Sequence, residues 1–88
     1  MNKSYSKKER EHIEEVKKLP CSVCDNRGPS EAHHIRQDDP YLCVALCDDC
    51  HRGAHNGIHG RKAIWRVMKM DEWDALSITF QRLLGVKQ

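Results

Sequence analysis

The sequence predicts a small α+β domain in which a β-hairpin and a short helix are held together by bound metal, with further helices before and after them. Three observations support this prediction. The chain has 88 residues, which make a single domain, and only 39% of them are hydrophobic, a thin core for that size. Five cysteines and five of the six histidines lie between Cys21 and His59. An odd number of cysteines that includes two Cys-x-x-Cys pairs favours metal over disulfides as the cross-link.

The first helix is expected at about residues 6–19. Ser6 and Glu9 have the spacing of a capping box, good helix formers follow, and Pro20 ends the helix. The apolar stripe of this helix consists of Ile13 and Val16 and is thin, so we expect light packing on the rest of the domain. Its basic residues either face a polyanion or only keep the helix soluble.

A ββα unit is expected next. Residues 32–36 and 41–46 are predicted to be two strands, joined by a turn that ends at Pro40. A helix is predicted from Asp48 to a stop at Gly57.

Two more helices are expected at residues 61–68 and 71–84, with Gly85 as the final stop. Their apolar residues recur at helical spacing, which is typical of a packed face. The residues expected in the core are Ile64, Trp65, Met68, Trp73, Leu76, Phe80, Leu83 and Leu84.

The clearest motif is a set of four cysteines, Cys21 with Cys24 and Cys47 with Cys50. Each pair spans a tight turn that directs both sulfurs to one ion, so the four predict a closed tetrahedral zinc site of structural type. The alternative is a redox pair or free thiols. Cys43 belongs to neither pair, and its simplest interpretation is a buried strand residue.

The histidines suggest a second metal site. His51 cannot easily share the zinc of Cys50, because neighbouring helical residues point about 100° apart. His55 lies four residues later on nearly the same face, so these two imidazoles either converge on another ion or are surface histidines. His33 and His34 are neighbours on a strand and point to opposite faces, so both serve one site only where the strand twists or ends.

These residue types suit phosphodiester cleavage, which needs a cation for the phosphoryl oxygens and a neutral imidazole to deprotonate water. The alternative for the neighbouring pair is that one histidine only makes a buried hydrogen bond. Residues 60–70 hold four basic and no acidic groups, although the net charge is only +2. This stretch either binds phosphates or is a solvated face.

The motifs resemble those of the HNH endonuclease superfamily, also called the ββα-metal or His-Me finger superfamily. The resemblance covers about residues 20–60. The stretch from Cys50 to Gly60, with the helices after it, is most similar to phage Ref-type recombination-associated nucleases. Where the family has an asparagine before the second cysteine pair, this chain has Leu42 and Cys43, which concerns loop geometry more than chemistry. The matching pieces are Cys21-x2-Cys24, Ala32-His33-His34-Ile35 and Leu46-Cys47-x2-Cys50-His51.

The resemblance implies one HNH-like domain over residues 1–88, with a zinc-stapled ββα-metal core, that hydrolyses DNA in a metal-dependent reaction and leaves 5′-phosphates. By position it implies that His33 and His51 bind the catalytic ion and that His34 is the general base. The remaining ligand is His55 or, in a Ref-like arrangement, His59. Besides the structural Zn²⁺, the implied cofactor is a catalytic Mg²⁺, Mn²⁺ or Zn²⁺.

DNA is the expected partner, and a recombinase filament is a second one suggested by the Ref-type resemblance. The alternative is a non-catalytic, zinc-stapled module that binds nucleic acid or protein. The sequence has no signal peptide or membrane segment, so we expect a cytoplasmic protein of a bacterium or a phage-infected cell. Contacts to DNA are expected mainly at phosphates. The residues expected to make them are Arg36, Arg52, Arg61, Lys62 and Arg66.

Overall fold

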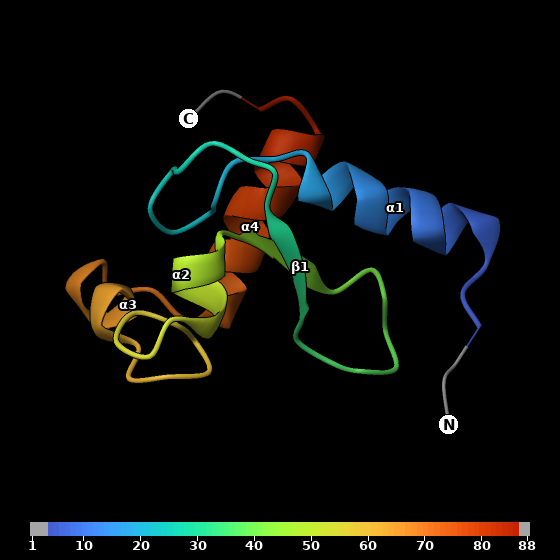
Figure 1. Cartoon of the computed structure of the whole chain (residues 1–88). Coiled ribbons are helices and arrows are strands. Elements are labelled where there is room, and N and C mark those ends of the chain that lie inside the picture. The colour runs from blue at the N-terminus through green and yellow to red at the C-terminus, as the bar shows by residue number, and fades with distance from the viewer. Residues whose placement is uncertain (1–3, 87–88) are drawn as a thin grey trace.

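A two-stranded antiparallel sheet lies at the centre of the molecule, with helices on both of its faces. The computed structural model describes residues 4–86, and Figure 1 shows its elements in chain order. They are α1 (Lys7–Lys17), β1 (Glu31–His34), β2 (Cys43–Leu46), α2 (Asp48–Arg52), α3 (Ala63–Val67) and α4 (Glu72–Leu83). Within the described residues the protein is therefore a small α+β fold of two strands and four helices, and the hairpin is confirmed.

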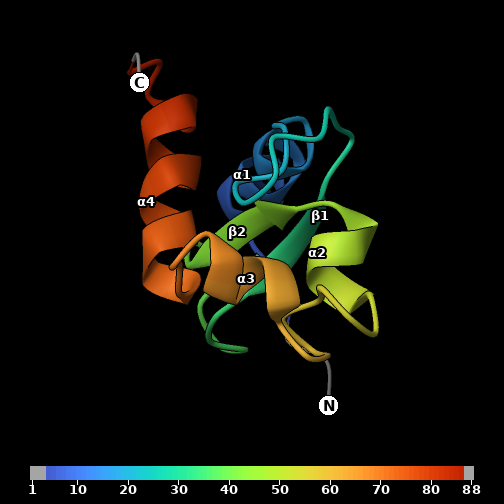
Figure 2. The same cartoon turned by 90° about the vertical axis from the view of Figure 1, so that its left-hand side faces the viewer.

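β2 separates two small cores. All four of its residues are fully buried, and successive side chains on a strand point to opposite faces. Val44 and Leu46 pack in a cluster with Trp65 and Leu76. Cys43 and Ala45 pack on the other face, with the α1 residues Ile13 and Val16. Figure 2 shows α3 in front of the hairpin and α1 behind it.

α1 begins as predicted. The Ser6 hydroxyl accepts a hydrogen bond from the Glu9 amide at 3.2 Å, and the Ser6 amide donates to the Glu9 carboxylate at 2.7 Å. Ile13 and Val16 are its buried residues. The capping box and the thin apolar stripe are both confirmed.

α2 is shorter than predicted, because it ends at Arg52 and not near Gly57. The chain after it folds into a tight loop in which two backbone segments touch. A Cβ atom on Gly57 would lie 2.5 Å from the Gly53 carbonyl oxygen, and a Cβ on Gly60 would lie 2.5 Å from the same atom. Only glycine allows this approach, and the loop turns back so that the His59 amide donates to the His51 carbonyl at 3.2 Å.

The predicted core is right for one face of each C-terminal helix and wrong at three positions. Trp65 and Leu76 are 2% and 7% exposed, and the Trp65 indole N–H donates to the Cys50 carbonyl at 3.0 Å. Met68, Trp73 and Leu84 are instead 50%, 57% and 78% exposed. Met68 and Leu84 are the residues that end their helices, beyond the part that packs on the hairpin.

α4 starts and stops close to the expected residues. Asp71 caps its N-terminus in a capping box with Asp74, and Gly85 follows its end with a φ of 74°. Among the described residues, no helix is both long enough and apolar enough to cross a membrane.

Candidate metal centres

The four cysteines Cys21, Cys24, Cys47 and Cys50 lie together, and their Sγ atoms are all within 4.8 Å of one another. The Sγ atoms of Cys24 and Cys47 are 3.7 Å apart. Two sulfurs on one tetrahedral zinc ion, each about 2.3 Å from it, are separated by about 3.8 Å. The cluster has the ligand type, number and spacing of a closed zinc site, so these cysteines could hold a structural zinc.

Backbone amides face the sulfurs. The Val23 amide lies 3.4 Å from the Cys21 sulfur, and the Cys50 amide lies 3.4 Å from the sulfur of Cys47, which caps α2. Such donors stabilise thiolates. The turn from Cys21 to Cys24 is linked to the rest of the fold by Thr79 of α4. The Thr79 hydroxyl lies 2.8 Å from the Ser22 hydroxyl and accepts a hydrogen bond from the Ala45 amide at 3.2 Å.

Two of the four thiols in this cluster need a cation in order to ionise near neutral pH. Burial and the neighbouring Cys21 thiolate raise the pKa of Cys24 to about 11, and burial also raises the pKa of Cys50. A coordinated divalent ion deprotonates such thiols. Cys43 lies on the other face of β2, fully buried, as predicted for the cysteine outside the cluster.

Three histidines form a second group. Single ring nitrogens of His33, His51 and His59 lie within 4.8 Å of one another, and Nδ1 of His33 is 3.3 Å from Nε2 of His51. The three rings come from β1, α2 and the glycine loop after α2. Of the two alternatives for the last ligand, His59 is in the group.

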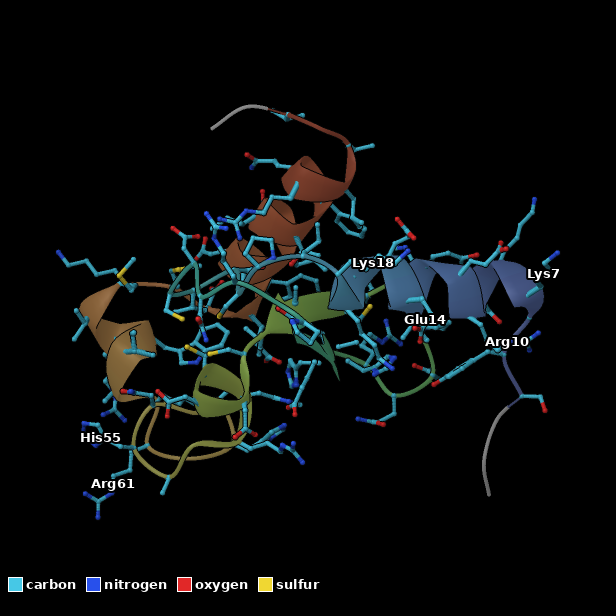
Figure 3. The ribbon with its side chains drawn as sticks, turned by 45° about the horizontal axis from the view of Figure 1, so that its top comes forward. Lys7, Arg10, Glu14, Lys18, His55 and Arg61 are labelled. Carbon is cyan, nitrogen blue, oxygen red and sulfur yellow. The ribbon has the colours of Figure 1, made fainter. Side chains whose placement is uncertain are left out.

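His55 is not in the group, because α2 has already ended at Arg52. Its side chain is exposed, and Figure 3 shows it beside Arg61 at the outer edge of the loop, pointing away from the molecule. The predicted pairing of His51 and His55 on one helix face is therefore wrong.

Carboxylates hold two of the clustered imidazoles. His33 Nε2 lies 2.5 Å from a Glu72 oxygen, and His51 Nδ1 lies 2.7 Å from a Glu31 oxygen. Glu31 is held in turn by Arg52, and the hydrogen bond from His51 together with the Arg52 charge lowers the pKa of the Glu31 carboxyl. When each neutral ring donates its N–H to its carboxylate, the lone pairs of the other two nitrogens face each other.

Two facing lone pairs repel unless a cation lies between them. Two imidazole nitrogens on one tetrahedral zinc ion are separated by about 3.3 Å, the spacing found between His33 and His51. The histidine cluster thus fits a metal ion with three protein ligands.

The two carboxylates were missed by the sequence-based reasoning. Glu31 precedes His33 by two residues, so the strand period places both on one face, a signal that could have been used. Glu72 comes from the first turn of α4, and no local pattern relates it to His33.

His34 is the last residue of β1 and pairs with Cys43, so its side chain leaves the hairpin on the face that α1 covers, opposite to that of His33. A cleft of about 450 Å³ is lined by His34 together with the clustered histidines, Lys62 and Glu72. The His34 ring stacks on Tyr5 with 6.3 Å between ring centroids, and its buried Nε2 atom has no hydrogen-bond partner among the described residues. Burial and the charge of Lys17 lower the pKa of His34.

The five basic residues predicted to contact phosphates lie in different surroundings. Lys62 lines the cleft, and Arg61 and Arg66 are exposed. Arg36 is 3.7 Å from Asp38. Arg52 is occupied with Glu31 and, at 3.2 Å, with Asp48.

Comparison of the chain with protein-family models, with curated proteins and with solved structures found no significant match. The function is therefore inferred from the chemistry of the two clusters.

Proposed function

We propose that this chain is a metal-dependent endonuclease of the HNH type, in which the hairpin, α2 and the cysteine cluster form a ββα-metal core. The observation that carries the proposal is the pair of carboxylate-held imidazoles, His33 and His51, whose other ring nitrogens face each other at 3.3 Å. A third imidazole, His59, completes a ligand set in the same cleft as the unpaired ring of His34.

The two clusters differ in the way that a structural and a catalytic ion differ. Four cysteines close a tetrahedral site, whereas three histidines leave a position for water or substrate. A zinc-stapled binding module needs only the cysteine cluster. The presence of the histidine cluster therefore favours an enzyme over a binding module.

A divalent ion bound by His33, His51 and His59 would neutralise the phosphoryl oxygens and the leaving 3′ oxygen. His34 accepts the proton of the attacking water at its Nε2 atom, which has no hydrogen-bond partner in the described part of the chain. Glu31 and Glu72 fix the tautomer and the direction of their imidazoles. Lys62 binds a phosphate in the cleft.

DNA is held mainly through its phosphates by Arg36, Arg61, Lys62 and Arg66, which gives weak sequence preference and strong dependence on salt. Arg52 acts chiefly on Glu31 and not on DNA. A recombinase filament as a second partner, and a phage origin, belong to the same proposal.

The test is plasmid nicking by the zinc-loaded full chain in Mg²⁺ or Mn²⁺, with His34→Ala compared with His55→Ala. His55 is a matched control, because it is an exposed histidine of the loop after α2 that lies outside the cluster. We expect nicking to be lost in His34→Ala and kept in His55→Ala, with the zinc content equal in both. Retained nicking in His34→Ala would reject this base, and no nicking by any form of the protein would favour the binding module.

A further inference from the structure

The basic residues after α2 form an uncompensated group. Residues 50–70 contain no aspartate or glutamate. Lys62, Arg66 and Lys69 are exposed, and their side chains make no ion pair within the described part of the chain. By contrast, Arg52 and Arg82 are each paired with acidic residues.

Of these three cations Arg66 lies on α3 itself, Lys62 is the residue before the helix, and Lys69 comes just after its end. The Arg66 amide donates to the Lys62 carbonyl at 3.1 Å, and the Lys69 amide donates to the Arg66 carbonyl at 3.1 Å. Lys62 lines the histidine cleft, so this basic segment begins at the candidate catalytic centre.

An exposed aromatic residue follows a cleft residue in the sequence. Trp73 directly follows Glu72, which lines the cleft and makes a hydrogen bond with His33. Trp73 itself is 57% exposed. The other tryptophan, Trp65, is 2% exposed and its N–H is satisfied. A large indole left in water, four residues after Lys69, has the chemistry of a surface on which unpaired bases stack, since a duplex hides the faces of its bases.

We propose that Lys62, Arg66, Lys69 and Trp73 bind a single-stranded stretch of nucleic acid next to the histidine cleft, with phosphates on the cations and a base on the Trp73 ring. The inference rests on the proposed function for the role of the cleft, and it narrows the substrate to DNA with an unpaired segment at the cut.

The test measures binding without cleavage. Labelled oligothymidylate is titrated with the zinc-loaded full chain in buffer without Mg²⁺ or Mn²⁺, and anisotropy is followed together with tryptophan fluorescence. A duplex and an oligouridylate of equal length form parallel arms, which separate single strands from duplex and DNA from RNA.

We expect oligothymidylate to quench the exposed tryptophan and to bind more tightly than the duplex. Trp73→Ala should weaken this binding by about 5- to 150-fold, because one base stack is lost, and Trp73→Phe should keep most of it. Tyr41→Ala is the matched control, since Tyr41 is another exposed aromatic residue, at 43% exposure, and should bind as wild type does. Lys69→Ala should lower the salt slope by about 0.7, whereas Lys8→Ala on α1 should leave it unchanged.

Duplex binding at least as tight as single-strand binding, or wild-type affinity in Trp73→Ala, would overturn the inference. Nicking without Trp73-dependent binding would reject the proposed single-strand surface and leave the proposed nuclease function in place. Trp73-dependent binding with no nicking in any divalent ion would reject the proposed nuclease function and leave the proposed single-strand surface in place.

Discussion

The cysteine cluster and the histidine cluster share one short helix but are built in different ways. α2 supplies Cys50 to the first and, at the next position, His51 to the second, and the angle of about 100° between neighbouring helical residues separates the two sites. The cysteines come from two local pairs, and Cys50 is 1% exposed. The histidines come from three separate elements, are held by carboxylates from β1 and α4, and line an open cleft. Under the proposed function, one cluster maintains the fold and the other does chemistry.

The largest expected effect is loss of the fold when zinc is removed. Zinc bound by four cysteines contributes about 10–16 kcal/mol in small zinc domains, more than the total stability of a chain this size. A strong chelator, or Cys47→Ala, should abolish the cooperative thermal transition seen by circular dichroism. Cys43→Ala, which changes the cysteine outside the cluster, should keep both the zinc and the transition. A folded, zinc-free protein would contradict this role.

Loss of a carboxylate should affect only the histidine cluster. Glu72→Gln removes the charge that holds His33, and we expect metal affinity at the histidines or nicking activity to fall about 10- to 100-fold. Zinc content should not change. Glu11→Gln, an exposed glutamate of α1, is the control and should behave as wild type does. Equal effects of the two variants would show that Glu72 does not position His33.

A smaller effect is expected from Gly60→Ala. The added Cβ would lie 2.5 Å from the Gly53 carbonyl oxygen, so the loop that carries His59 must shift. Strain of this kind costs about 1–3 kcal/mol of unfolding free energy. Chemical denaturation measures that loss, and weaker metal binding at the histidines should accompany it while the cysteine site stays loaded. An unchanged histidine site would mean that His59 is not held by this loop.

The sequence predicted those features that depend on residues close together in the chain. The capping box of Ser6 and Glu9, the hairpin and the two cysteine pairs all depend on short spacings. The end of α2 was predicted wrongly, because it is decided by contacts of Gly57 and Gly60 with Gly53. The role of Glu72 could not be predicted, because this residue reaches His33 only when α4 folds back beside β1. Helical periodicity alone also does not show that the Trp73 side chain lies outside the packed face of α4.

The central claim is that one chain holds two metal centres of different kinds, and titration with Co²⁺ tests it most directly. We expect the first equivalent to give thiolate charge-transfer absorption, and a second equivalent to bind without adding to it. His33→Ala should lose the second equivalent alone, and His55→Ala should keep both. Saturation at one ion per chain, or a second equivalent that survives in His33→Ala, would contradict the account.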